Sequence, residues 1–237
     1  MVFATVIQTN SNLFNPKNIN QDSKISPELA EILGLLSSDG TYYKYLSFER
    51  RFFKKRGKYY FTIQEKERID FGNTNFGLLK SFQKLLLKEF GYKTKITGKE
   101  IPKINITKKS IIKDLLKFTY FGFDRWKVPQ ITFNSPNNVK ASYVRGIYEG
   151  DGVKLQKNSN GFEVRIEMMN KAGLEQIKIL LLDLGINSSV STCGKGMYRL
   201  YIRGIENITK FKEIIKPKFK TIKLGWQNQA MRTMKNG

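Results

Sequence analysis

Two aspartates end two similar stretches of this chain. Asp39 ends a run that begins at Leu33, Asp151 ends a run that begins at Arg145, and a glycine follows each aspartate. Both runs are typical of helices with a small residue at every fourth position, on one face. Two such helices can pack closely and bring the two carboxylates together. In a basic chain, paired carboxylates indicate metal-dependent chemistry on phosphate. The small residues are Ala30, Gly34 and Ser38 in the first run and Ser142, Gly146 and Gly150 in the second.

The charge of the chain indicates a polyanionic partner. Forty-two Lys and Arg residues outnumber 20 Asp and Glu residues, for a net charge of +22. Nucleic acid is the first candidate, because neutralising phosphates releases counterions and supplies affinity. An acidic membrane surface is disfavoured, since no basic amphipathic helix stands apart from the core pattern. A ribosomal-type RNA-binding protein would share the charge but would not explain two aligned Asp-Gly helix ends.

The chain contains no histidine. This excludes nucleases with a histidine base, Cys/His zinc sites and the common hydrolase triads, and it argues against a self-splicing intein. No phosphate-loop motif for nucleotide hydrolysis occurs, and the single cysteine, Cys193, excludes an internal disulfide. No apolar run approaches the roughly 18 residues needed to cross a bilayer. We therefore expect a soluble intracellular protein without a membrane partner, in an organelle (mitochondrion or chloroplast) or in an archaeal cytoplasm.

The hydrophobic pattern predicts the same order of elements twice: helix, hairpin, helix, hairpin, helix. In the first half these are a helix capped by Ser26 that ends at Ser38 with Gly40 as its C-terminal glycine, strands 41–53 and 58–64, helix 76–90, hairpin 93–107 and helix 110–118. In the second half they are a helix opened similarly by Ser135, strands 153–156 and 162–168 around an Asn160-Gly161 turn, helix 174–184, hairpin 189–203 and helix 207–215. The repeat predicts a pseudo-two-fold molecule. The expected divisions are a tail (1–24), a first half (25–117), a linker (118–134) and a second half (135–237).

The paired runs and the repeated elements resemble LAGLIDADG homing endonucleases, in the monomeric form with two motifs. The resemblance implies an α+β fold of two pseudo-symmetric αββαββα halves, with saddle-shaped antiparallel sheets and the motif helices packed at the interface. It implies an intron-encoded, Mg-dependent endodeoxyribonuclease that makes a double-strand break with 3′ overhangs in a long asymmetric DNA target. Two or three Mg²⁺ ions would bind at Asp39 and Asp151, where two close carboxylates need cations between them.

The same resemblance suggests further site residues by position. A polar residue that ends the strand after the first hairpin turn lies near the metal-bound waters, and Gln64 takes that position, with Glu167 as its counterpart. A basic residue after the last helix of each half faces the phosphates, and Lys127 and Lys223 fit. Lys154, just after the second motif, is a further candidate.

The second motif is less regular than the first. Glu149 adds an acid before Asp151 and could compete as a ligand, but Asp151 precedes Gly152 as Asp39 precedes Gly40. Since Arg145 and Glu149 are four residues apart, we expect an ion pair on the helix surface.

Basic residues concentrate in the hairpins, where alternate side chains share a face and can enter a major groove or contact phosphates. The expected DNA-binding residues are Lys44, Arg50, Arg51, Lys54, Lys55, Arg56, Lys58, Gln156, Lys157, Arg165, Lys195, Arg199 and Arg203. Two such halves imply an asymmetric target of roughly two helical turns. Two alternatives stay open: an RNA-splicing maturase that binds intron RNA, and a DNA-binding relative without catalytic activity.

Overall fold

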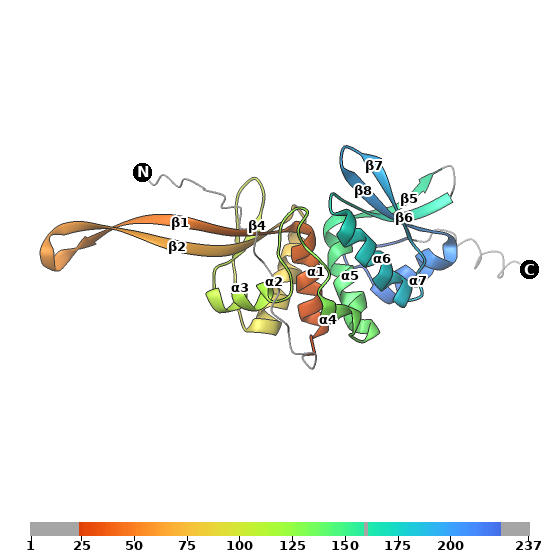
Figure 1. Cartoon of the computed structure of the whole chain (residues 1–237), viewed down its shortest axis with the longest axis horizontal. Helices are drawn as coiled ribbons and strands as arrows, with labels where there is room; N and C mark the ends of the chain where they lie inside the picture. The colour runs from red at the N-terminus through yellow and green to blue at the C-terminus, as the bar shows by residue number, and fades with distance from the viewer. Residues whose placement is uncertain (1–23, 159–160, 224–237) are drawn as a thin grey trace, which may run out of the picture.

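The computed structural model describes residues 24–158 and 161–223. Two similar halves lie side by side, with helices α1 and α5 adjacent where they meet (Figure 1). Most of the expected tail, and Asn160 of the expected turn, lie outside the described residues.

The first half contains one four-stranded antiparallel sheet. Its elements in chain order are α1 (Pro27–Asp39), β1 (Gly40–Phe53), a 3-10 turn (Lys54–Arg56), β2 (Lys58–Gly72), α2 (Phe76–Phe90), β3 (Ile96–Thr97), β4 (Lys103–Ile106) and α3 (Lys109–Leu116). The strand order is β1-β2-β4-β3. Strands β1 and β2 form a long ribbon that projects far beyond the helices (Figure 1).

The second half repeats this topology. After the short helix α4 (Gln130–Phe133) come α5 (Asn137–Asp151), β5 (Gly152–Asn158), β6 (Gly161–Met168), α6 (Lys171–Asp183), β7 (Ser189–Gly194), β8 (Met197–Arg203) and α7 (Ile205–Ile215). The strand order β5-β6-β8-β7 matches that of the first sheet. The predicted fold class, two αββαββα halves with the motif helices at the interface, is confirmed.

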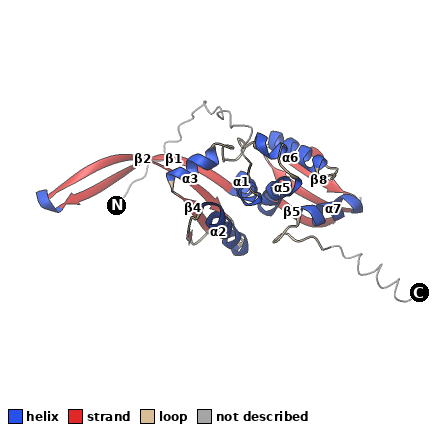
Figure 2. Cartoon of the chain, turned by 90° about the horizontal axis from the view of Figure 1, so that it is seen from below, coloured by secondary structure: helices blue, strands red, loops and turns tan. Residues whose placement is uncertain are grey.

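The core lies between the helices and one face of each sheet. Ile69 and Phe71 of β2 and Val164 and Ile166 of β6 are fully buried there, and each such side chain contributes about 1.5–3 kcal/mol. Because side chains alternate along a strand, the residues between them point to the opposite face. The helices lie on the same side of both sheets (Figures 1 and 2), so these opposite faces form one common side of the molecule.

Three local expectations were wrong. Strand β2 continues to Gly72 rather than ending at Gln64, because its last residues alternate into the core. Gly40 is not a left-handed helix cap: its φ is −91°, and it leads directly into β1. Ser26 does cap α1 through the Leu29 amide at 2.9 Å, but the Ser135 hydroxyl donates to the Ile131 carbonyl and leaves α5 without a side-chain cap.

The segment 118–134 packs against both halves. The Phe121 carbonyl accepts from the Tyr42 amide at 3.4 Å. Buried Trp126 fills the space above Gly173 of α6, and its carbonyl accepts from the Asn170 side chain at 2.7 Å. Among the described residues, no helix is both long enough and apolar enough to span a bilayer.

Candidate active site

Glycines allow the two motif helices to touch along their backbones. A Cβ on Gly146 would lie 2.5 Å from the Glu31 carbonyl oxygen and 2.7 Å from the Leu35 amide. A Cβ on Gly34 would collide with the Tyr143 carbonyl, and one on Gly150 with the Ser38 side chain. The predicted small-residue stripes therefore do meet, and the helices run side by side to their C-terminal ends.

This packing brings Asp39 and Asp151 together. The Cβ position of Gly150, next to Asp151, is 3.0 Å from the Asp39 carboxylate. Burial, and then the charge of Asp39, raise the pKa of Asp151 to about 7. Burial also raises the pKa of Asp39. Both residues are half-buried, and a close carboxylate pair that resists ionisation is a site that a cation would stabilise.

Asn73 completes the surroundings of Asp39. Its side-chain amide donates to Asp39 Oδ2 at 2.8 Å, which holds one carboxylate oxygen in place and opposes the rise in the Asp39 pKa. Sequence reasoning missed Asn73, because it placed the end of β2 too early. Its position, directly after β2, was the available signal.

Lys220 is the second residue that the sequence analysis missed. Its ammonium donates to the Gly150 carbonyl oxygen, and its charge lowers the pKa of both Asp39 and Asp151. Burial lowers the pKa of Lys220 itself, against the pull of the two aspartates. We expected a lysine after the last helix and chose Lys223, but in so basic a segment the sequence could not distinguish the two.

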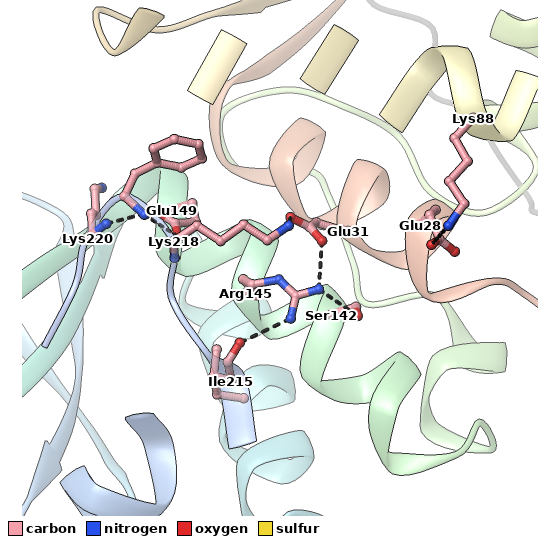
Figure 3. A network of polar contacts seen from close by, with 10 residues as sticks. Glu28, Glu31, Lys88, Ser142, Arg145, Glu149, Ile215, Lys218 and Lys220 are labelled. Carbon is pink, nitrogen blue, oxygen red and sulfur yellow. Dashed lines mark hydrogen bonds and ion pairs between the residues drawn. The ribbon is translucent and has the colours of Figure 1, made fainter. Parts of the chain in front are cut away.

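Glu149 binds the backbone of a later segment of the chain. It is buried, and its carboxylate accepts hydrogen bonds from the backbone amides of Lys218, Phe219 and Lys220. The expected surface ion pair between Arg145 and Glu149 is also wrong. Arg145 instead reaches across the interface to Glu31 of α1, with Nη2 2.6 Å from Oε2 (Figure 3).

The donor set fits Mg²⁺. The two aspartates supply hard carboxylate oxygens, and Mg²⁺ is commonly bound by one or two carboxylates together with substrate phosphates and water. Among the described residues, no group of three or more Asp, Glu, His or Cys side chains could hold a metal.

The other expected site residues are scattered. Gln64 pairs with Ser47, seven residue pairs along the ribbon from Gly40, which is about 24 Å at the rise of a strand, so it does not lie at the aspartate pair. Glu167 is bound by Arg165 and Arg199, each at 2.9 Å.

The three remaining lysine candidates have exposed side chains. Lys127 and Lys223 are both exposed, and their roles stay predictions. Lys154 is close enough for its charge to lower the pKa of Lys220. Of the three, Lys154 is the one whose charge acts on Lys220.

The register of the ribbon divides the basic residues of the first hairpin. Arg51 and Lys58 lie on the face shared with Arg68, opposite the helices, which we call the open face. Lys44 and Arg50 lie on the helix side, where Lys44 pairs with Glu65 at 2.8 Å and Arg50 stacks on Tyr59 at 3.7 Å. The turn residues Lys54, Lys55 and Arg56 are exposed at the tip. Sequence reasoning overlooked Lys66 and Arg68, which also lie on the open face.

On the open face of the second sheet, arginines and glutamates alternate in one ionic chain. Arg203 contacts Glu163 at 3.1 Å, Glu163 contacts Arg165 at 3.3 Å, and Glu167 joins Arg165 to Arg199. The glutamates hold the three expected arginines in place. Of the other expected residues, Gln156 pairs with Glu163, while Lys157 pairs with Phe162 and Lys195 lies in the β7–β8 turn.

Comparisons with known proteins support this description. The family model "LAGLIDADG-like domain" matches residues 138–216. Three curated relatives come from Methanocaldococcus jannaschii. The transcription initiation factor IIB is 24% identical over 87% of this chain and 26% of its own length. The uncharacterized protein MJ1054 is 29% identical over 40% of this chain and 11% of its own length. A probable translation initiation factor IF-2 is 33% identical over 37% of this chain and 8% of its own length. The chain thus spans about a quarter or less of these relatives, and their names describe much longer proteins.

Solved structures match across both halves. The homing endonuclease I-DmoI in complex with DNA and Mn superposes with a TM-score of 0.54 at 19% identity, over 83% of this chain and 100% of that chain. The N-terminal LAGLIDADG domain of DUF199/WhiA gives a TM-score of 0.52 at 16% identity, over 86% of this chain and 88% of that chain. Because this fold occurs in proteins of different names, the fold alone does not assign cleavage. Residues 138–216 thus match the LAGLIDADG-like domain, and the duplicated topology of the whole chain is similar to that of the solved two-motif structures.

Proposed function

We propose that the protein is a site-specific homing endonuclease that makes a double-strand break in an asymmetric DNA target. The close pair of half-buried acids Asp39 and Asp151, at the ends of two helices packed backbone to backbone, is the observation that carries this proposal. Two carboxylates with a purely structural role would only repel each other at this separation and destabilise the fold. The supporting comparison is I-DmoI, solved in complex with DNA and Mn, with DNA and Ca, and, as a variant, with its target DNA in the presence of Mg.

In this proposal DNA lies across the open faces of both sheets. Those faces carry Arg51, Lys58 and Arg68 in the first half and Arg165, Arg199 and Arg203 in the second. The two sheets lie on either side of helices α1 and α5 (Figure 1), which end at the two aspartates. Phosphate contacts would fix the register, and side chains reaching base edges would select the sequence.

The residues at the centre have separate tasks. Asp39 and Asp151 would hold Mg²⁺, and Asn73 fixes the orientation of the Asp39 carboxylate through its 2.8 Å hydrogen bond. When bound there, Mg²⁺ supplies Lewis-acid stabilisation of the charge that develops on the phosphate oxygens. Lys220 and Lys154 add positive charge beside the aspartates, where the scissile phosphates would enter. One aspartate per half provides one acid for each DNA strand. The finer features, namely an intron-encoded monomer that leaves 3′ overhangs, belong to the same proposal.

The test is cleavage of duplex DNA that spans the host locus without the inserted reading frame. Wild-type protein should cut both strands with Mg²⁺, and Asp39→Asn should lose at least about 100-fold of the rate, as expected when a group that stabilises transition-state charge is removed. Both proteins should bind the duplex equally with Ca²⁺. Binding without any Mg²⁺-dependent cut would instead favour the inactive DNA-binding alternative. Tighter binding to the intron transcript than to the duplex would favour the maturase.

A further inference from the structure

The segment after the last helix crosses from the second half to the first. We call residues 216–220 the strap. Lys218 Nζ lies 2.8 Å from Glu31 Oε1 of α1, and Phe219 packs so closely on the first turn of α2 that a Cβ on Gly77 would lie 2.9 Å from its ring. Figure 3 shows Lys218 and Lys220 on either side of the Glu149 carboxylate, with Lys218 extending to Glu31.

A single buried carboxylate anchors the strap. Glu149 is 2% exposed. Its oxygens accept from the Lys218 amide, from the Phe219 amide at 3.0 Å and from the Lys220 amide at 3.1 Å. Three consecutive amides on one carboxylate form charge-assisted hydrogen bonds that fix the path of the backbone. The strap residues from Lys218 to Lys220 belong to no helix or strand, so no ladder of backbone bonds holds them otherwise.

The anchored strap ends at the aspartate pair. Lys220 is the third of the three bound residues, and its ammonium reaches the Gly150 carbonyl, beside Asp151. Glu149 itself is two residues before Asp151 on α5. The C-terminal end of α5 therefore carries Asp151, which belongs to the site, and Glu149, which binds the backbone of the segment that carries Lys220.

We propose that Glu149 is a positioning residue: it binds the strap backbone so that Lys220 is delivered to Asp39 and Asp151. This inference rests on the proposed cleavage activity for its kinetic consequence, but its structural consequence can be measured without cleavage. It assigns to the extra acid of the second motif a role other than metal binding.

The first test is amide hydrogen exchange in the full chain. In the wild type, the amides of residues 218–220 should exchange slowly, and in Glu149→Gln they should exchange at least about 10-fold faster, because the neutral amide group cannot accept all three bonds. Leu181→Ala is the matched control, since it removes buried apolar volume from α6 and none of the hydrogen bonds between Glu149 and the strap. Equal exchange of the three amides in wild type and Glu149→Gln would overturn the proposal.

The second test is a double-mutant cycle with single-turnover cleavage in Mg²⁺. Glu149→Gln should slow cutting about 10–100-fold, the usual effect of losing a group that orients the residues of a metal site. Lys220→Met should slow it at least as much, and the double variant should be no slower than Lys220→Met alone, because Glu149 acts through Lys220. Losses that multiply would show a merely structural role and overturn the proposal. If the wild type cuts no target, the proposed function fails, while the exchange experiment still decides whether Glu149 holds the strap.

Discussion

Asp151 carries the largest electrostatic cost of the candidate site. Its pKa of about 7 lies above the ordinary value of 3.8, because burial and the neighbouring Asp39 both oppose ionisation. Because the pKa of Asp151 is raised in the folded state, its carboxyl group contributes fully to the free energy of unfolding below about pH 4, where it is protonated. That contribution is lost as the pH rises through 7. The aspartate pair therefore lowers the free energy of unfolding of the metal-free protein at neutral pH, and a bound cation would offset this destabilisation.

We expect Asp151→Asn to stabilise the metal-free protein at pH 8. The substitution removes the buried charge, so the variant should gain on the order of 2–3 kcal/mol over the wild type between pH 5 and pH 8. Urea unfolding in EDTA at the two pH values measures this gain. The exposed Asp124→Asn is the control and should show no such trend. At pH 8, Ca²⁺ should raise the melting temperature of the wild type but not of Asp151→Asn, and a pH-independent difference would contradict this account.

Arg50 and Arg51 offer a matched pair on the long ribbon. Arg51 lies on the open face, and Arg50 lies on the helix side with its guanidinium over Tyr59. If DNA lies on the open faces, Arg51→Ala should weaken binding and reduce the salt slope by about one ion. Arg50→Ala should leave the slope unchanged. Fluorescence anisotropy over a salt series in Ca²⁺ measures both, and the reverse ranking would place DNA on the other face.

At the residue scale, the sequence predicted the two acids but not all of their neighbours. Asp39 and Asp151 could be found because helix periodicity and the following glycines mark both copies. Asn73 and Lys220 could not, since their positions depend on where β2 ends and on the path of an irregular segment. The role of Glu149 was also hidden, because its partners are backbone amides about 70 residues away along the chain. Backbone amides carry no residue type that a sequence pattern can reveal.

At the element scale, the contact between α1 and α5 determines the separation of the two aspartates. We expect Gly146→Ala to destabilise the protein by about 1–3 kcal/mol, the usual cost of overpacking, because the new methyl would press on the Glu31 carbonyl and the Leu35 amide. Cleavage should fall as well, since the helices must separate. Gly72→Ala is the matched control, as its nearest neighbour would lie at 3.6 Å. Chemical denaturation and cleavage of both variants measure the effect, and equal stabilities would contradict it.

The elements themselves were largely predictable. Helix α2 has the expected bounds, and both hairpin-helix repeats are present, because amphipathic periodicity dominates where one face is buried. Prediction was poorest at ends without periodic signal. In β2 the strand continues past Gln64 through residues whose alternation is set by pairing with β4. The absence of a cap at Ser135 depends on a competing carbonyl, which is a tertiary detail.

At the scale of the whole molecule, the two halves are unequal in reach. Strands β1 and β2 have 14 and 15 residues, whereas β5 and β6 have 7 and 8. At about 3.4 Å per residue, the first ribbon extends about 24 Å further than the second, which is the length of about seven base pairs. The pseudo-two-fold topology predicted from the repeat is thus accompanied by a strong asymmetry in length (Figure 1).

This asymmetry predicts an off-centre footprint. With DNA on the open faces, protection should extend further from the cut on the side of the first half, because only that side has the long ribbon and its basic tip. Replacing residues 48–63 by a two-residue turn should shorten protection at that end alone and leave the cleaved bonds unchanged, since Asp39 and Asp151 lie at the opposite end of the ribbon. Hydroxyl-radical footprinting in Ca²⁺ and mapping of the cut in Mg²⁺ measure the two effects. Protection that is symmetric about the cut, or that shortens at both ends, would show that the ribbon does not lie along the DNA.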